Sequence, residues 1–414
     1  MRIAVVNWSS RRVGGIETYL NALIPALERA EHQVAFCCET DGPAPQNRIS
    51  LAAAAPFWCV TDIGADKVLA GLRSWQPDLI YVHKIMNPEL ETELLKIAPA
   101  VFFAHDYQRT CISGNKTHQF PMVQPCDRRF GAACLLHYFP HRCGGLNPIK
   151  MMQLYRQQTR RLELLRRYDA VVTHSEHMLR ELIKNGISRD RISTHPFLVE
   201  RGYAEQAAGA VERKAGDDIQ LIFCGRMERL KGGETLLDAV PQVQRALGKK
   251  ILIVFAGDGR QLGKWKRRAA GLQHKHPAIE VKFVGWGDQS FLDKLFAESD
   301  LLVVPSLWPE PFGLVGPEAG LRGLPAAAFA VGGISEWLVD GVNGHLAPAA
   351  PPTAKGLADA IIRCLENRER YAQLRQGSLR LAAEFNAVRH LHSLMTVFNR
   401  VVSQRAGDFT TSGN

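Results

Sequence analysis

Short apolar runs alternate with helix-like segments along most of this chain, and this alternation constrains its fold more than any other feature. In the first half, the runs expected to form strands are residues 3–6, 34–38, 78–83, 100–105 and 169–175. The second half repeats the pattern at residues 219–225, 251–257, 281–285, 300–306 and 325–333. Continuous runs of Val, Ile and Leu between helices are typical of parallel strands that are buried on both faces. Two such series predict an α/β protein with two doubly wound domains.

The length of the chain supports a division into two domains, because 414 residues exceed what one ordinary core holds. We expect an N-terminal Rossmann-like domain over residues 1–200 and a C-terminal one over residues 201–385. Residues 386–414 are expected to form a C-terminal helix. Between the domains, residues 196–216 lose the strand pattern and are rich in Ala, Gly and charge, which predicts a linker.

Residues 106–150 form an irregular insert that is dense in Cys, His, Pro, Gly and Arg. Such an insert inside a compact domain is usually functional or mobile, and this one follows a strand end, where open sheets place ligands. Its cysteines, near three histidines, are Cys111, Cys126, Cys134 and Cys143. They lack the Cys-x-x-Cys pair typical of structural zinc, so we favour ordinary thiols over a metal site and predict no metal.

The formal net charge of +10 suits an anionic ligand or an anionic membrane, and it also suits nucleic acid. The apolar run at residues 3–6 is too short for the core of a signal peptide, and no run of 18 apolar residues is present that would span a membrane. We therefore expect a cytoplasmic protein.

The strongest motif covers residues 306–325 and follows the strand expected at residues 300–306. If a helix begins near Gly313, its free amide groups and positive dipole end point into the crevice and can cradle a diphosphate. Glu310, just outside that helix, can then face a sugar hydroxyl, and Glu318 can accept hydrogen bonds from a ribose diol. The alternative is a pair of solvated glutamates near a capped helix.

Three weaker motifs also follow expected strands. Arg226 and Lys231 precede an apolar-periodic helix and could clamp a diphosphate, or they could belong to a basic surface loop. Gly14 and Gly15 would let the backbone approach a phosphate, although a glycine pair is also common in turns. His105 ends its strand and could bond a reacting sugar, or it could be a satisfied histidine beside an acidic neighbour.

Taken in order, these motifs resemble glycosyltransferase family 4, retaining enzymes of the GT-B fold, in which two Rossmann-like domains face each other across a cleft. The resemblance covers most of the chain. It rests on the early Gly-Gly-x-Glu at residues 14–17, His-Asp at 105–106, Gly-Arg and Lys-Gly at 225–226 and 231–232, Phe-Ala-Gly-Asp-Gly at 255–259, and the paired glutamates. Many relatives carry an Asn-Gly-Val/Ile pattern after the inter-domain strand, whereas residues 191–200 here read RISTHPFLVE.

The resemblance implies roles for individual residues. Arg226 and Lys231 would hold the donor diphosphate, Glu310 the donor sugar and Glu318 the ribose. The other implied contacts are backbone amides on phosphate at Gly313, Leu314 and Val315, Gly15 next to Gly14 closing over the diphosphate, and His105 beside the sugar. The N-terminal domain would bind the acceptor, the C-terminal domain the donor, and the C-terminal helix would pack back on the N-terminal domain.

The implied reaction is sugar transfer from a nucleotide-diphosphate sugar to an acceptor hydroxyl, in cell-surface polysaccharide or glycolipid biosynthesis. Arg226, Lys231 and the helix start at Gly313 would supply positive charge to the leaving group, so we expect no metal or other cofactor. The alternatives are a GT-B sugar-nucleotide epimerase or phosphorylase, or a non-catalytic protein that binds nucleotide or nucleic acid. We expect a glycan or lipid-linked glycan as acceptor, and no nucleic acid partner.

A basic segment at residues 150–167 mixes Met and Leu with positive charge. Its basic residues are Lys150, Arg156, Arg160, Arg161, Arg166 and Arg167. An amphipathic basic helix can lie on an anionic bilayer, which would make the protein peripheral on the inner face of the cytoplasmic membrane. An ordinary solvated helix face is the alternative.

Overall fold

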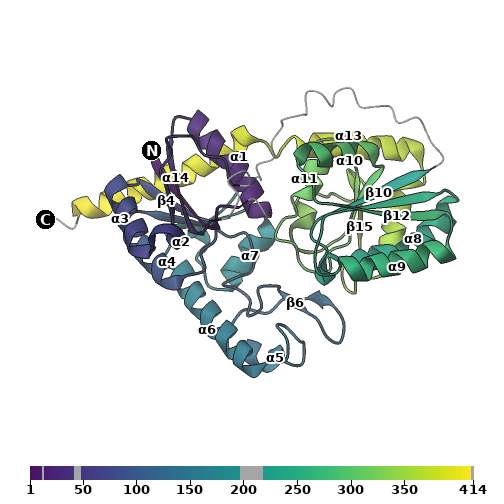
Figure 1. The fold of residues 1–414 in the computed structure, drawn as a ribbon, viewed down its shortest axis with the longest axis horizontal. Helices are drawn as coiled ribbons and strands as arrows, with labels where there is room; N and C mark the ends of the chain where they lie inside the picture. Colours follow the sequence, from purple (N-terminus) through teal and green to yellow (C-terminus); the bar gives the residue numbers. More distant parts are fainter. Residues whose placement is uncertain (12–13, 42–47, 196–217, 412–414) are drawn as a thin grey trace.

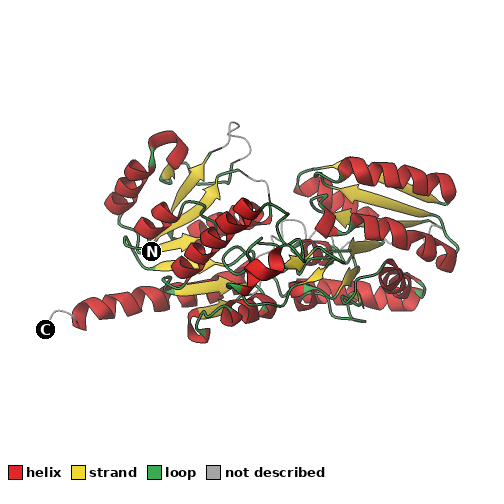
Figure 2. Cartoon of the chain, turned by 90° about the horizontal axis from the view of Figure 1, so that it is seen from below, coloured by secondary structure: helices red, strands yellow, loops and turns green. Residues whose placement is uncertain are grey.

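The computed structural model describes residues 1–11, 14–41, 48–195 and 218–411. Two α/β units lie side by side (Figure 1), and each has a layer of strands between helices (Figure 2). The linker predicted at residues 196–216 lies outside the described residues. Among the described helices, none is long and apolar enough to cross a membrane.

The N-terminal unit contains a seven-stranded sheet in the order β3-β2-β1-β4-β5-β8-β9, and all its neighbouring strands are parallel. The strands are β1 (Arg2–Ser9), β2 (Gln33–Thr40), β3 (Phe57–Cys59), β4 (Leu79–Val82), β5 (Ala100–Phe103), β8 (Ala170–Thr173) and β9 (Ile192–Thr194). The helices are α1 (Gly15–Arg29), α2 (Val60–Ile63), α3 (Ala65–Trp75), α4 (Pro88–Leu94), α5 (Ala133–Tyr138), α6 (Pro148–Leu165) and α7 (Glu176–Lys184), with the short η2 (Arg189–Arg191) before β9.

The C-terminal unit contains a six-stranded parallel sheet in the order β12-β11-β10-β13-β14-β15. The strands are β10 (Ile219–Cys224), β11 (Ile251–Ala256), β12 (Ile279–Gly285), β13 (Leu301–Val304), β14 (Ala326–Phe329) and β15 (Gly344–Ala347). The helical elements are η3 (Arg229–Lys231), α8 (Gly233–Leu247), α9 (Leu262–Lys275), α10 (Gln289–Glu298), α11 (Val315–Gly320), η4 (Gly332–Glu336), α12 (Ala354–Leu365) and α13 (Arg368–Ala382).

Each sheet reverses its strand order once, at β1 between β2 and β4 and at β10 between β11 and β13. The apolar runs at these positions are buried on both faces, which is why both strands sit in the middle of their sheets. In open parallel sheets, ligands bind outside the carboxyl ends of the strands at such reversal points. Ligand-binding residues are therefore expected in the loops after β1 and β4 and in the loops after β10 and β13.

The last helix, α14 (Ala387–Thr411), leaves the C-terminal unit and runs along the N-terminal one (Figure 1). It packs against α1 and β5. The imidazole Nε2 of His390 lies 2.8 Å from the hydroxyl of Tyr19, and the ring of Phe398 lies 5.0 Å from that of Tyr81. The final helix thus connects the two units, and it lies on the face of the N-terminal sheet that α1 covers.

Candidate active site

Glu310 and Lys231 meet at the carboxyl edge of the C-terminal sheet, Glu310 from the loop after β13 and Lys231 from the end of η3. Lys231 Nζ lies 2.6 Å from Glu310 Oε1, and the hydroxyl of Ser306 donates to the same carboxylate oxygen. The ring of Trp308 covers the ammonium group, with 5.4 Å between Nζ and the ring centroid. Since Glu310 is buried, this pairing compensates its charge.

The backbone after Glu310 exposes amide groups. Gly313 has a φ of 95°, a conformation that favours glycine, and its carbonyl accepts from Gly316 at 3.1 Å. The helix α11 begins at Val315, so the predicted start near Gly313 is a turn and then a helix of one to two turns. Within the described part of the chain, the amides of Gly313, Leu314 and Val315 donate no hydrogen bond. Adjacent unpaired amides are suited to binding anionic oxygens.

Glu318 lies in α11, half-buried, and burial raises its pKa to about 7. Arg322 opposes this shift, and the nearby Asp293 adds to it. The guanidinium of Arg322 pairs with Asp293 and also donates to the carbonyl of Glu318 at 2.7 Å. The carboxyl group of Glu318 is therefore poised between its protonated and ionised forms near neutral pH.

His105 follows β5 in the N-terminal unit and is held as a neutral imidazole. Its Nε2 lies 2.8 Å from Nδ1 of His83, and its ring stacks on Phe103 with 4.0 Å between centroids. Burial lowers the pKa of His105 to about 3. A neutral imidazole can orient a hydroxyl by hydrogen bonding but carries no positive charge at physiological pH. Sequence reasoning did not identify His83, although it ends the run predicted at residues 78–83.

Gly15 and Arg226 complete the set of predicted residues. Gly14 caps α1 and is exposed, as is Gly15. A Cβ atom added to Gly15 would lie 3.6 Å from Cδ1 of Leu314, so the start of α1 faces the loop of free amides across the two units. The side chain of Arg226 is exposed and makes no ion pair with the described residues. The structure thus gathers Gly15, Lys231, Glu310 and Leu314 in one place.

The four cysteines of the insert converge on one small cavity. Cys111, Cys126, Cys134 and Cys143 line it together with His118 and His137. Burial raises the pKa of Cys143 to about 12 and also raises the pKa values of Cys126 and Cys134, so these thiols stay protonated. Over residues 1–11, 14–41, 48–195 and 218–411, no group of three or more His, Cys, Asp or Glu side chains is arranged to hold a metal ion.

The predicted basic face over residues 150–167 needs correction. Arg161 points inward and is buried, where it donates to the carbonyl of Met86 at 3.3 Å. Arg160 is exposed, but it pairs with Glu89 at 2.7 Å. The helical period places Arg161 with the buried leucines of α6, so the six basic side chains do not form one solvent-facing stripe.

Comparisons with known proteins give one consistent result. Residues 13–199 match the family model described as Glycosyltransferase Family 4, and residues 204–379 match Glycosyl transferases group 1. An uncharacterized glycosyltransferase of Methanocaldococcus jannaschii is 26% identical over 83% of this chain and 84% of its own length. A glycogen synthase of Mycobacterium tuberculosis is 26% identical over 93% and 91%. A phosphatidyl-myo-inositol mannosyltransferase of Mycobacterium leprae is 34% identical over 46% of each chain.

Solved structures resemble the whole chain in fold. Anabaena HepE in complex with UDP-glucose has a TM-score of 0.64 at 20% identity, over 98% of this chain and all of that one. TarM of S. aureus, in a complex that contains UDP, has a TM-score of 0.68 at 11% identity, over 96% of this chain and 99% of that one.

Proposed function

The chain belongs to the group 1 glycosyltransferases of family 4 and has their GT-B fold of two Rossmann-like domains, and from this we propose that it moves a sugar from a nucleoside diphosphate to an acceptor hydroxyl with retained anomeric configuration. One observation carries the proposal. The Lys231–Glu310 pair lies beside the unpaired amides of Gly313–Val315, with Gly15 of the other unit facing them. Structural neighbours whose complexes contain UDP or UDP-glucose support a nucleotide-sugar donor.

The leaving diphosphate would develop negative charge between Lys231, Arg226 and the free amides. An ammonium group has three N–H donors, so Lys231 can keep Glu310 and still donate to a phosphate oxygen. Preorganised donors aimed at developing charge are usually the largest catalytic term. Under this proposal no divalent metal is needed for the leaving group.

The two glutamates would recognise the ends of the donor. Glu310, held by Lys231 and Ser306, would accept hydrogen bonds from sugar hydroxyls, and Glu318 from the ribose. His105, a neutral imidazole of the N-terminal unit, would donate or accept one hydrogen bond at the sugar. The acceptor would enter from the N-terminal side, next to the insert at residues 106–150.

A screen of nucleotide sugars tests this function. Ligands that bind the native state raise its melting temperature, so UDP-, GDP-, ADP- and dTDP-sugars are compared by thermal shift. The best donor is then incubated with candidate acceptors, and the anomeric configuration of the product is read by NMR. Absence of stabilisation by every nucleotide sugar, or a product of inverted configuration, would contradict the proposal.

We also propose that the acceptor is lipid-linked and that the protein docks on an anionic bilayer through an apolar tip. The tip consists of Leu136 on α5, Leu146 before α6 and Ile149 in the first turn of α6, which are 77%, 65% and 69% exposed. Residues 128–162 contain no Asp or Glu. The charged residues of this segment are therefore all basic. Exposed apolar side chains in such a segment favour insertion among anionic head groups.

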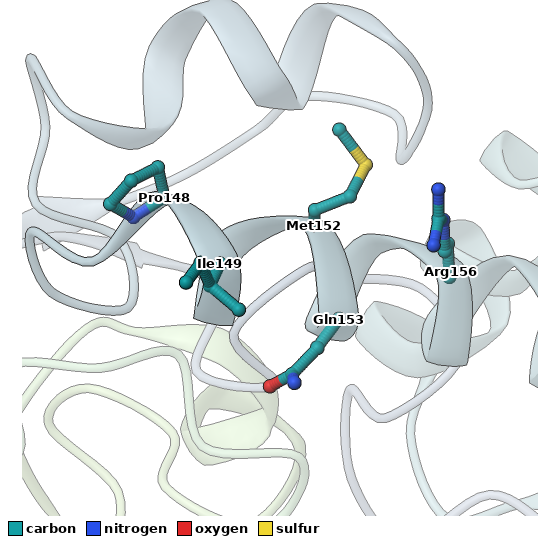
Figure 3. Close-up of a pocket in the computed structure, with 5 residues that line it drawn as sticks. All are labelled: Pro148, Ile149, Met152, Gln153 and Arg156. Atoms are coloured by element: carbon teal, nitrogen blue, oxygen red, sulfur yellow. The ribbon is translucent and has the colours of Figure 1, made fainter.

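The first turns of α6 also border an open surface pocket of about 440 Å³ (Figure 3). Its lining residues are Pro148, Ile149, Met152, Gln153 and Arg156. In this close-up the guanidinium of Arg156 rises from the helix on the same side as the thioether of Met152. A lining that combines apolar side chains with the guanidinium of Arg156 suits a lipid whose head group is anionic.

A further inference from the structure

The segment that carries Glu310 is held by hydrogen bonds to its backbone carbonyl groups. Each of the four consecutive carbonyl groups at residues 309–312 accepts one hydrogen bond. The donors, in order, are the hydroxyl of Tyr107 at 2.7 Å, the amide of Gly333 at 2.6 Å, the hydroxyl of Ser175 at 2.6 Å and Nε1 of Trp337 at 2.9 Å. Regular secondary structure supplies none of these bonds.

The donors alternate between the two units. Gly333 and Trp337 belong to or follow η4 of the C-terminal unit, whereas Tyr107 and Ser175 belong to the N-terminal unit. The two N-terminal donors hold the carbonyls on either side of Glu310. Side chains of the N-terminal unit therefore help to set the backbone conformation of the Glu310 segment in the C-terminal unit. The two units also meet where α7 packs against η4.

The single proton of the Tyr107 hydroxyl must point at Pro309, because a carbonyl oxygen can only accept. Nε2 of His177 lies 2.7 Å from the same phenolic oxygen and must then donate to it. Burial lowers the pKa of His177 to about 4, so this imidazole is neutral with its proton on Nε2. Burial also raises the pKa of Tyr107 well above its usual range, which keeps the hydroxyl protonated.

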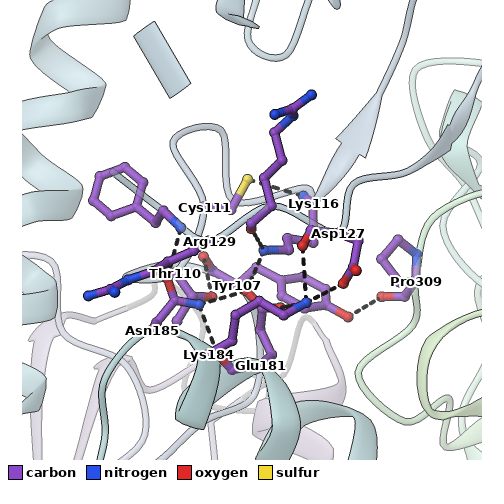
Figure 4. Close-up of polar contacts among 12 residues, drawn as sticks. Tyr107, Thr110, Cys111, Lys116, Asp127, Arg129, Glu181, Lys184, Asn185 and Pro309 are labelled. Carbon is purple, nitrogen blue, oxygen red and sulfur yellow. Dashed lines mark hydrogen bonds and ion pairs between the residues drawn. The ribbon is translucent and has the colours of Figure 1, made fainter. Parts of the chain in front are cut away.

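Lys116 and Glu181 form a buried ion pair next to the ring of Tyr107. Figure 4 shows Lys116 of the insert reaching Glu181 on α7, next to the Tyr107 ring, whose hydroxyl points away toward Pro309. Lys116 also donates to the carbonyl of Arg128. These contacts fix the insert to α7, so the position of Tyr107 is set by both elements.

The hydroxyl of Ser175 has two partners. It accepts from the amide of Met178 at 3.1 Å, which caps α7, and it donates its proton to the carbonyl of Pro311. The start of α7 is thereby attached to the loop after β13.

We propose that Tyr107 and Ser175 are positioning residues for sugar transfer, which hold the Glu310 segment from the opposite unit without touching the donor. The inference rests on the proposed function of the same site. By fixing the carbonyls on both sides of Glu310, they aim its carboxylate at the cleft. They also fix the turn that leaves the following amides unpaired.

The first test replaces Tyr107 by Phe, which removes only the hydroxyl. We expect turnover with the best donor from the screen to fall about three- to tenfold, the effect of one lost hydrogen bond, with a smaller change in UDP affinity. Hydrogen–deuterium exchange should quicken at the amides of Gly316, Glu318 and Gly333, which donate to the carbonyls of Gly313, Leu314 and Glu310. Tyr138→Phe is the matched control, because its buried hydroxyl has no partner among the described atoms and neither readout should change.

The second test separates the two tasks of Ser175. Ser175→Asp retains an acceptor that caps α7 but cannot donate to a carbonyl when ionised, whereas Ser175→Ala loses both contacts. We expect both variants to lose turnover and to exchange faster at the amides of Gly316, Glu318 and Gly333. Ser175→Thr keeps a hydroxyl and should restore both readouts toward wild type.

The readouts distinguish two kinds of failure. Unchanged exchange at the amides of Gly316, Glu318 and Gly333 in Tyr107→Phe and Ser175→Asp would overturn the positioning role, whatever the protein catalyses. Faster exchange with unaltered turnover would overturn it as well. If these variants exchange faster but the wild type uses no nucleotide sugar, the hydrogen bonds from Tyr107 and Ser175 do hold the loop. That result would count against the proposed function alone.

Discussion

Lys231 and Glu310 come from different loops of one unit and form a direct ion pair beside the free amides. We expect Lys231→Ala to lower turnover by well over tenfold, because it removes a positive partner of the leaving group and leaves Glu310 buried beside fewer donors. Steady-state kinetics and calorimetric titration with the nucleoside diphosphate of the best donor measure the effect. Arg229→Ala is the control, since it removes an exposed charge from the same η3 turn.

Nearly unchanged kinetics in Lys231→Ala, or an equal loss in Arg229→Ala, would contradict the assignment of Lys231 to the diphosphate. Loss of folding is monitored separately by the melting temperature of each variant.

Glu318 makes stability depend on pH. Its pKa is about 7 in the folded protein, whereas an unfolded chain has about 4.3. Between these values the folded state binds more protons, so the free energy of unfolding falls as pH rises and levels off above about pH 7. Glu318→Gln removes this titration. We call the free energy of unfolding of the variant minus that of wild type, measured by urea denaturation, the advantage of the variant. This advantage should therefore grow from about pH 4.5 to about pH 7.

The same pair of proteins tests the ribose role of Glu318. Ribose hydroxyls that donate to the carboxylate favour its ionised form. A saturating concentration of the best donor's nucleoside diphosphate should therefore reduce the advantage of Glu318→Gln at pH 7. The 2′-deoxy nucleotide should reduce it less. An advantage that does not change with pH, or an equal effect of both nucleotides, would count against this account.

At the scale of elements, the sequence indicates the long buried strands but not the short ones. Every apolar run predicted as a strand lies on one, because parallel strands buried on both faces are continuous in Val, Ile and Leu. The strands β3, β9 and β15 were not predicted. They have only three or four residues, and Ser193 interrupts the apolar character of β9 as His345 does that of β15. Two short strands of the insert, β6 (Thr117–His118) and β7 (Gln124–Pro125), were also missed.

The contacts that shape the candidate site were the least predictable from sequence. Tyr107 and Ser175 lie 202 and 136 positions before their carbonyl partners, and no local pattern encodes such pairs. Ser306 and Trp308 lie inside the motif at residues 306–325, so their closeness to Glu310 could have been anticipated. The motif at residues 306–325 indicates which residues of the C-terminal unit lie near Glu310. The hydrogen bonds from Tyr107 and Ser175 depend on how the two units fold together.

The apolar tip predicts how the protein binds membranes. Ile149→Asp and Leu146→Asp place a negative charge at its centre, so co-sedimentation with phosphatidylglycerol vesicles should fall several-fold. Binding of the wild type should need anionic lipid and weaken with salt, because part of the attraction is electrostatic. Val388→Asp is the control, since Val388 is 79% exposed but lies on α14.

Reversing the charges of Arg160, Arg166 and Arg167 should have a weaker effect than Ile149→Asp, because the tip and not the whole of α6 meets the bilayer. Equal binding of Ile149→Asp and wild type, or undiminished binding to neutral vesicles, would contradict docking through the tip.

At the scale of the whole molecule, the candidate donor site is divided between two units. Lys231, Glu310 and Glu318 belong to the C-terminal unit, whereas Gly15 and His105 belong to the N-terminal one. The units already meet where Tyr107 and Ser175 hold the loop after β13, and α14 joins them at the back. A diphosphate bound at the free amides would lie against the start of α1, so a complete site requires both units to close on it.

Gly15→Val tests this closing. A Cβ atom at Gly15 meets Leu314 at an ordinary contact distance of 3.6 Å, but the two methyl groups of Val would extend into the space that the diphosphate needs. We expect the variant to bind the nucleoside diphosphate of the best donor through the C-terminal unit and to lose sugar transfer by more than tenfold. With the nucleoside diphosphate of the best donor, small-angle scattering should show a smaller radius of gyration for wild type and little change for Gly15→Val. Gly271→Val on α9, where an added Cβ meets nothing within 4 Å, should behave like wild type. Normal transfer by Gly15→Val, or no compaction of the wild type with the nucleoside diphosphate of its best donor, would show that the site works without the two units closing over the diphosphate.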